Sequence, residues 1–240
     1  MLRAANIFNG VLWLERSERN GYKMKIIAHR GFWIEEREKN TLYALERALK
    51  NGYGIETDLR DYKEDLVISH NIANEKSIKL EDFFQLYCEC GNRALLALNV
   101  KADGIQKMLE TLLVKYDIEN YFLFDMSIPE LVVNSSRNLR FYTRSSDIER
   151  ECVLYDKAAG IWVDAFYDEN WLDEKVVMRH IKANKEVCLV SPELHGNDFT
   201  RVWKLLKETG LYKNDLLALC TDMPDSAEEY FNEYNKSNFI

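Results

Sequence analysis

The sequence predicts an α/β fold, a (β/α)8 TIM barrel, and three observations support this prediction. Short β-like runs alternate with amphipathic segments from residue 25 onward, which is typical of a parallel sheet with helical crossovers. Eight such units occur without a break in composition, in a chain of 240 residues, the usual size of one barrel. No Gly-rich nucleotide fingerprint opens a helix, so a doubly wound open sheet is the less favoured alternative.

The eight predicted strands are short apolar runs that end in polar residues. They span 25–31, 54–60, 94–101, 121–127, 140–146, 160–166, 186–192 and 216–222. A ninth β-like run, 65–70, follows the second strand closely, and we expect it to extend that unit.

The predicted helices lie between the strands. In the first of them, Asn40 or Thr41 can cap the start, Gly52 can close the end, and Leu42 and Leu45 share one face. The helical segments are 40–52, 79–91, 103–116, 147–160, 170–184, 199–210 and 224–236.

The domain prediction is a single barrel over residues 24–240, preceded by an N-terminal extension over residues 1–23. The apolar run in this extension, 7–14, is too short to span a bilayer, and no small-residue cleavage site follows it. Either the biological start is Met24 or the extension forms a short helix against the barrel. We therefore expect no membrane insertion.

Charge and cysteine content limit the partners and the compartment. The net charge of −8 repels a phosphate backbone, so we expect no nucleic-acid binding. The number of cysteines is odd and their spacing is irregular, which disfavours a disulfide framework and favours a reducing, cytoplasmic compartment. The five cysteines are Cys88, Cys90, Cys152, Cys188 and Cys220.

A candidate metal site lies on the second and third predicted strands. Glu56 and Asp58 are two residues apart, so both side chains face the same space and repel each other unless a cation relieves them. Oxygen ligands of this kind suit Mg²⁺ or Ca²⁺. Asn99 and Lys101 have the same spacing on the next strand. The alternative is an ion pair between a carboxylate and Lys101 that closes the barrel mouth.

Two of the four histidines lie at the ends of predicted strands. His29 is followed by Arg30, a bidentate anion donor, and by Gly31, a permissive turn residue, while His70 ends the ninth run. Histidines can exchange protons near neutral pH, and their position beside a carboxylate pair favours catalysis over a structural role. Further polar residues lie at the ends of the strands: Asp125, Arg144, Asp164, Glu193, His195 and Asp222. The three aspartates among them could instead cap helices or anchor loops.

These motifs together resemble the glycerophosphodiester phosphodiesterase family, within the wider group of phosphatidylinositol-phospholipase-C-like phosphodiesterases. Four segments are similar. They are His-Arg-Gly at the end of 26–31, an Asn-Thr helix start with a Glu-x-Asp pair in 40–60, a histidine at the end of 66–71 that corresponds to the family's His-Asp element, and Thr-Asp-x-Pro at 221–224. Strong similarity covers 25–71, and the rest of the chain matches mainly by the order of its strands.

The resemblance implies a role for each matching residue. His29 and His70 correspond to the acid–base pair, Arg30 corresponds to a residue that holds the phosphate, and Lys101 would lie against a phosphate oxygen. The implied substrate is a small or lipid-derived phosphodiester. In the implied reaction, a neighbouring hydroxyl attacks phosphorus, an alcohol leaves, and water opens the cyclic phosphate.

The resemblance also implies a divalent cation, Mg²⁺ or Ca²⁺, held by Glu56, Asp58 and, at the position of a third carboxylate, Asn99. A neutral amide ligates through its oxygen but holds a cation more weakly than a carboxylate does. Two alternatives therefore stay open: a catalytically impaired barrel that binds a phosphorylated ligand, and a lyase that stops at the cyclic phosphate.

Other departures from the family concern the substrate pocket. Lys39 stands where a glutamate usually precedes Asn-Thr, Asn71 replaces an aspartate after His70, and the region often inserted after this histidine is absent or very short. After strand seven, 191–196 contains Glu193 and His195 instead of a Trp-Thr-x-Asn element. These two residues form either part of a different pocket or an ordinary turn.

Overall fold

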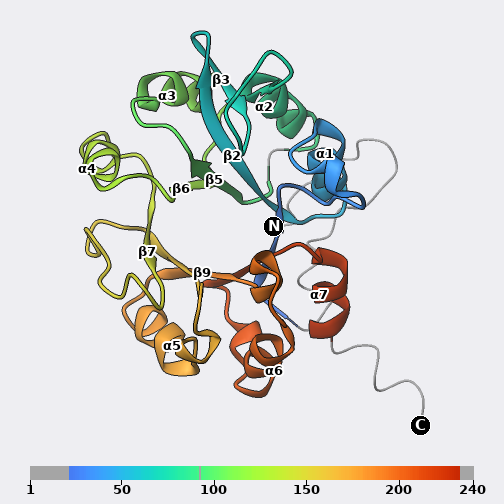
Figure 1. Cartoon of the computed structure of the whole chain (residues 1–240), viewed down its shortest axis with the longest axis vertical. Coiled ribbons are helices and arrows are strands. Elements are labelled where there is room, and N and C mark those ends of the chain that lie inside the picture. The colour runs from blue at the N-terminus through green and yellow to red at the C-terminus, as the bar shows by residue number, and fades with distance from the viewer. Residues whose placement is uncertain (1–21, 92, 233–240) are drawn as a thin grey trace, which may run out of the picture.

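Eight parallel strands form a ring in the computed structural model, which describes residues 22–91 and 93–232 (Figure 1). Parallel pairing runs from β6 through β5, β2, β1, β10, β9 and β8 to β7. A parallel bridge between Leu123 and Phe141 joins β6 to β7 and closes the ring. The ring consists of β1 (Lys25–His29), β2 (Gly54–Tyr62), β5 (Leu96–Val100), β6 (Tyr121–Phe124), β7 (Tyr142–Ser145), β8 (Gly160–Val163), β9 (Glu186–Val190) and β10 (Leu217–Thr221).

The barrel and all eight of its predicted strands are thus confirmed. The ninth predicted run is also confirmed as part of the second unit, because β3 (Asp65–Ile68) pairs antiparallel with β2 and then with the short β4 (Ile78–Lys79).

The helices lie outside the ring of strands (Figure 1). Six of the seven predicted helices are confirmed. The α-helices are α1 (Leu42–Lys50), α2 (Leu80–Glu89), α3 (Gln106–Lys115), α4 (Ile128–Ser136), α5 (Glu174–Lys182), α6 (Thr200–Glu208) and α7 (Pro224–Phe231). Short 3₁₀ turns are η2 (Glu36–Glu38), η3 (Glu169–Trp171), η4 (Pro192–His195) and η5 (Leu211–Lys213).

One predicted helix is absent from the structure, and one helix that the structure contains was not predicted. The segment 147–160 forms turns instead of a helix, because Leu154 has a left-handed backbone with φ 53° that interrupts a helical path. Conversely, α4 was not predicted from the sequence. The Ser127 side chain caps it by accepting a hydrogen bond from the Glu130 amide, although its β-branched and polar residues have modest helix propensity.

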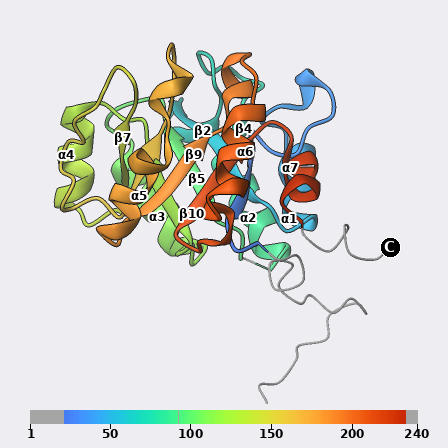
Figure 2. The ribbon, with the colours of Figure 1, turned by 90° about the horizontal axis from the view of Figure 1, so that it is seen from below.

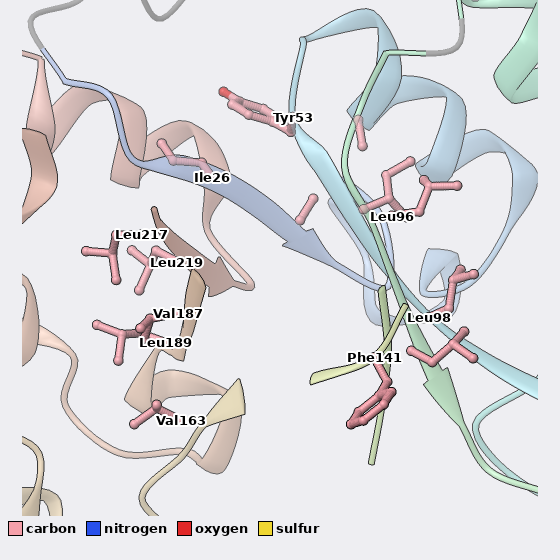
Figure 3. Packing of buried hydrophobic residues seen from close by; sticks show 14 of the residues in the cluster. Ile26, Tyr53, Leu96, Leu98, Phe141, Val163, Val187, Leu189, Leu217 and Leu219 are labelled. Atoms are coloured by element: carbon pink, nitrogen blue, oxygen red, sulfur yellow. The ribbon is translucent and has the colours of Figure 1, made fainter. Parts of the chain in front are cut away.

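The outer core fills the space between the strands and the helices. Alternate strand residues such as Leu96 and Leu98 of β5 and Leu217 and Leu219 of β10 are buried there (Figure 3). The helices α6 and α7 lie next to each other in both ribbon views (Figures 1 and 2), and the Trp203 ring centroid of α6 is 5.8 Å from that of Phe231 in α7.

The inner core consists of the strand residues that alternate with the outer set. Aromatic rings from β6, β7 and β8 fill much of it, with Phe122 stacked on Tyr142 at 3.7 Å and Phe124 stacked on Trp162 at 3.8 Å between centroids. Gly160 makes room for this packing, since an added Cβ would lie 2.6 Å from the Tyr142 ring.

The predicted boundary at residue 24 falls beside the first described residues. Tyr22 and Met24 are buried in the outer core, and the amides of Lys23 and Met24 both donate to the Tyr212 carbonyl at 3.1 Å. The predictions for residues 1–21 and for the end of the last helix, 233–236, lie outside the described residues.

The five cysteines are all unpaired, as the sequence predicts, and Cys188 and Cys220 are buried in the inner core. Within the described ranges, no helix has the length and apolar character needed to cross a bilayer.

Candidate active site

Strand alternation brings the predicted polar residues to one end of the barrel interior. The parallel register aligns His29 of β1 with Glu56 of β2, and Asp58 of β2 with Asn99 of β5. By strand alternation, these four side chains face the barrel interior, as Ile27 of the inner core does. They lie at the C-terminal ends of the strands, where TIM barrels carry their active sites.

His29 is held between two carboxylates. Its Nδ1 lies 2.6 Å from Oδ1 of Asp222, and its Nε2 lies 3.8 Å from Oε2 of Glu56. An imidazole that donates its Nδ1–H to a carboxylate leaves Nε2 available as a proton acceptor. Glu193 fixes the Asp222 backbone in turn, because its Oε1 accepts hydrogen bonds from the Asp222 amide, at 3.2 Å, and from the Thr221 hydroxyl.

Arg30 reaches the site through an unusual turn. Its backbone has φ 56° and that of Gly31 has φ 87°, so two successive residues adopt the left-handed region. This turn directs the Arg30 amide to Glu56 Oε2 at 3.1 Å and the guanidinium Nε to Asp58 Oδ2 at 3.3 Å. An added Cβ on Gly31 would lie 2.8 Å from the backbone of Ala44, so only glycine fits there.

The three residues of the predicted metal site lie together and are buried. Burial, followed by the charge of Asp58, raises the pKa of Glu56 to about 7, against the opposing charges of His29, Arg30 and Lys101. Asn99 donates to Glu56 Oε1 at 3.4 Å. The carboxylate pair is therefore only partly neutralised by its neighbours.

The donor set fits a hard cation. Asp58 Oδ1 and Asn99 Oδ1 are buried without a hydrogen-bond partner, and such oxygens are the ligands that Mg²⁺ and Ca²⁺ prefer. Within the described part of the chain, no three His, Cys, Asp or Glu side chains are grouped as metal ligands. The set is thus two carboxylates and one amide.

Asn40 belongs to the site, although the sequence indicated only a possible helix cap. Its Nδ2 donates to Asp58 Oδ2 at 2.8 Å, and its Oδ1 accepts from the Thr57 hydroxyl at 2.8 Å. Thr41 caps α1 instead, by accepting from the Ala44 amide. The Asn-Thr pair in the sequence could have indicated this role. When one of the two residues caps the helix, the polar side chain of the other is free to make a different contact.

Lys101 forms the ion pairs that the sequence left open. Its Nζ lies 3.7 Å from Asp58 Oδ1 and 3.2 Å from Asp125 Oδ2. Arg144 contacts the other oxygen of Asp125 at 3.2 Å. The end of β6 therefore positions Lys101 beside the carboxylate pair.

The three aspartates at the ends of β6, β8 and β10 cap no described helix. Asp125 and Asp222 pair with cationic or imidazole side chains, and Asp164 accepts from His195 Nε2 and from the Ala165 amide, each at 2.8 Å. The hydrogen bond from His195 to Asp164 raises the pKa of that imidazole.

His70 does not join the buried cluster. Its side chain is exposed and its Nδ1 lies 3.2 Å from the Asn71 side chain, the residue that stands in place of an aspartate. It lines, together with Arg30 and Asn40, an open groove of about 440 Å³. The remaining predicted site residues, His29, Arg30, Glu56, Asp58, Asn99 and Lys101, are brought together at the barrel mouth.

Comparison with known proteins gives matches in structure but not in sequence. No family model and no curated protein matches the sequence. A protein from Galdieria sulphuraria assigned to the glycerophosphodiester phosphodiesterases is 18% identical with a TM-score of 0.70, over 87% of this chain and 97% of that one. A phosphodiesterase from Oleispira antarctica, in complex with the product sn-glycerol-3-phosphate, is 16% identical with a TM-score of 0.61, over 86% and 96%.

A more distant structure is similar as well. It is a Ca²⁺-dependent phosphatidylinositol-specific phospholipase C from Streptomyces antibioticus, 7% identical with a TM-score of 0.54, over 87% of this chain and 96% of that one. At these identities the likeness concerns the fold, and it agrees with the fold that the sequence motifs imply. The chain has the (β/α)8 barrel fold of the glycerophosphodiester phosphodiesterases.

Proposed function

We propose that this protein hydrolyses a glycerophosphodiester-like substrate, releasing an alcohol and a phosphomonoester. The observation that carries the proposal is the His29–Asp222 pair at 2.6 Å, which orients an imidazole beside the cations Arg30 and Lys101. A phosphodiester carries one negative charge, and two cations beside a proton acceptor favour its cleavage because they stabilise the charge that develops on the phosphoryl oxygens. The glycerol phosphate bound to the Oleispira antarctica protein supports this substrate class.

The first stage is attack by a hydroxyl of the substrate on its own phosphorus. His29 Nε2 accepts the hydroxyl proton while the new O–P bond forms, and Asp222 stabilises the resulting imidazolium through Nδ1. The P–O bond to the alcohol breaks, and protonated His70 gives a proton to the leaving oxygen. Arg30 and Lys101 neutralise the charge on the phosphoryl oxygens.

The second stage opens the cyclic phosphate with water. His70 accepts a proton from the attacking water, and the His29 imidazolium returns its proton to the ring oxygen that leaves. Both histidines recover their starting protonation, and one water is consumed per diester. His70 lines the groove beside Arg30, so the leaving alcohol would lie in that groove.

A divalent cation, when bound, would supply Lewis-acid stabilisation of the phosphoryl oxygens. Glu56, Asp58 and Asn99 would hold it through the oxygens described above, with two negative charges rather than three. We propose either Mg²⁺ or Ca²⁺ as this cation. The Ca²⁺-dependent enzyme of the same fold supports a role for a divalent cation.

The test is release of alcohol and phosphomonoester from a panel of glycerophosphodiesters, with and without Mg²⁺ or Ca²⁺. We expect metal-dependent turnover in the wild type and its loss in His29→Ala. The matched control is His195→Ala, which removes an imidazole that contacts Asp164 at the same end of the barrel and which should retain turnover. Absence of turnover in the folded wild type would contradict the proposal.

A binding-only function is the second candidate, favoured by one observation. The carboxylate pair already has protein counter-ions, with Arg30 Nε 3.3 Å and Lys101 Nζ 3.7 Å from Asp58. Binding of glycerol 3-phosphate without turnover of any diester would support it. Accumulation of a cyclic phosphate would instead identify the lyase alternative, because only full hydrolysis consumes water.

Five unpaired cysteines favour a reducing, cytoplasmic compartment. We expect a small-molecule diester as the partner and no nucleic acid, in keeping with the net charge of −8. The single barrel domain over 24–240 remains the predicted functional unit.

A further inference from the structure

The groove beside the proposed catalytic residues extends well beyond them. It holds about 440 Å³ and is bounded by two segments of the chain. One wall comes from the connection between β1 and α1, and the other from the end of β3 and the loop that leads to β4. Arg30, at the start of the first wall, also lines the groove. The residues of the walls are Glu36, Lys39, Asn40 and Thr41 on the first, and 68–72, 74 and 76–78 on the second.

More basic than acidic side chains line this groove, although the protein as a whole is acidic. Arg30, Lys39 and Lys76 line it against a single carboxylate, that of Glu36, whereas the whole chain has a net charge of −8. Ligand attraction depends on the local field of the groove rather than on the net charge. The groove is therefore suited to a ligand with more than one negative charge.

The Lys39 side chain is held in place in the groove, but its ammonium group can still bind an anion. Its side chain is 21% exposed, and its Nζ lies 4.3 Å from the centroid of the Trp33 ring, which limits the positions it can take. Nζ lies 3.4 Å from Glu36 and 3.9 Å from Asp222. Because the Glu36 side chain is 86% exposed, its ion pair with Lys39 is weak. A bound anion can replace it.

Lys76 comes from the opposite wall. Its side chain is exposed, and its amide donates to Asn74 Oδ1 at 2.9 Å, which fixes the turn that carries it. Ser77 closes the same turn, because its hydroxyl accepts from the Asn74 amide at 3.0 Å. Lys39 and Lys76 thus line the same groove from two separate segments of the chain.

We infer that Lys39 and Lys76 form a second anion subsite, separate from the phosphodiester position beside Arg30 and Lys101. The inference rests on the proposed function and names its substrate class: a phosphodiester whose alcohol carries a further anionic group, a carboxylate or a phosphate. Lysine ammonium groups bind such groups as point charges, and each contributes most at low ionic strength.

The test compares two probes that differ by one phosphate, propyl phosphate and 1,3-propanediol bisphosphate. Calorimetric titration at low ionic strength, without added divalent cation, gives the affinity of each. We expect the bisphosphate to bind the wild type at least tenfold more tightly. This advantage should fall at least fivefold in Lys39→Met and in Lys76→Met, and Lys39→Arg should retain most of it.

Lys79→Met is the matched control, since the Lys79 amine pairs with Asp65 at 2.8 Å and does not line the groove. It should leave the advantage of the bisphosphate unchanged. Equal affinity for the two probes in the wild type would overturn the inference, and so would an advantage that persists in both groove variants. Alcohol release from diesters tests the proposed function separately, because the two probes report binding whether or not the protein turns a diester over.

Discussion

The Nδ1 of His29, at the end of β1, lies 2.6 Å from Oδ1 of Asp222, which directly follows β10. The two residues are 193 positions apart in the sequence. The parallel pairing of β1 with β10, in which Ala28 is opposite Thr221, brings the next residue of each strand together. The orientation of the proposed base therefore depends on closure of the barrel between its first and last strands.

Asp222→Asn should strongly reduce turnover while leaving substrate binding nearly unchanged. An amide in this position no longer fixes the His29 tautomer with Nε2 free, and it does not stabilise the imidazolium. We expect kcat to fall by about 10²-fold, the scale of a lost acid–base contribution, with KM within about threefold. Alcohol release under steady-state conditions measures both constants.

Asp164→Asn provides the comparison for this prediction. It removes the carboxylate that His195 contacts at 2.8 Å, so it makes the same chemical change at the same end of the barrel. Activity close to that of the wild type is expected. An equal loss in the two variants would mean that the His29–Asp222 contact has no special part in the reaction.

Asn99→Asp should strengthen binding of a divalent cation. The substitution adds a third negative charge to the oxygens of Glu56 and Asp58, which are only 1% exposed. We expect the Kd for Mg²⁺ or Ca²⁺ to fall about tenfold, equivalent to about 1.4 kcal/mol. Calorimetric titration of the protein without substrate measures this directly and does not depend on activity.

The same variant should be less stable than the wild type in the presence of a chelator, because a third carboxylate is then buried beside two others. Thermal unfolding with and without the cation shows this as a larger metal-dependent rise in Tm. If neither protein binds a divalent cation, side chains of the protein, among them Arg30 and Lys101, balance the charge of the carboxylate pair, and the binding-only function gains support.

The sequence predicts the strands well because each is an apolar run that ends in a polar residue, as in the run from Leu96 to Lys101. Alternation then also predicts that Glu56 and Asp58 face one space, and the structure brings them together with Asn99. The helix α4 was missed because Val132 and Val133 disfavour a helical interpretation when taken without their tertiary contacts.

Partners that are distant in the chain could not be predicted. The sequence identified Asp222 as a polar residue at the end of a strand, but only closure of the barrel brings it next to His29. Similarly, the sequence does not reveal that His70 is exposed on a groove wall, because this follows from how β3 turns back on β2. Local patterns therefore identified the residue types of the site, and the tertiary structure determined their contacts.

Gly31→Ala should destabilise the fold considerably more than Gly104→Ala. Both glycines have φ 87°, so each alanine carries the same backbone strain, about 1 kcal/mol. At Gly31 the new Cβ would also lie 2.8 Å from the Ala44 backbone, whereas at Gly104 it meets nothing within 4 Å. We expect losses of about 3 and about 1 kcal/mol, measured by urea unfolding. Equal losses would show that the turn before α1 moves without cost.

Because of the buried His180, the free energy of unfolding should be lower in mild acid than at neutral pH. Its side chain is 2% exposed, and burial, followed by the charge of Arg179, lowers its pKa from 6.5 to about 4. Arg179 donates to Nε2 at 3.0 Å and Tyr155 Oη lies 3.0 Å from Nδ1, so the folded protein holds the neutral ring. The unfolded chain takes up a proton below pH 6.5 that the folded protein does not bind until about pH 4.

The contribution of His180 is therefore fully present above pH 6.5 and is lost as the pH falls toward 4. Between pH 7 and pH 4.5 this loss amounts to about 2 kcal/mol for the wild type. His180→Gln, which has no titratable group at this position, should lack this part of the pH dependence. Urea unfolding measures the loss of stability of each protein between the two pH values. The difference between the two losses excludes the titration of all groups that the proteins share. Parallel pH profiles for the two proteins would mean that the ring is protonated in the folded protein at its ordinary pKa.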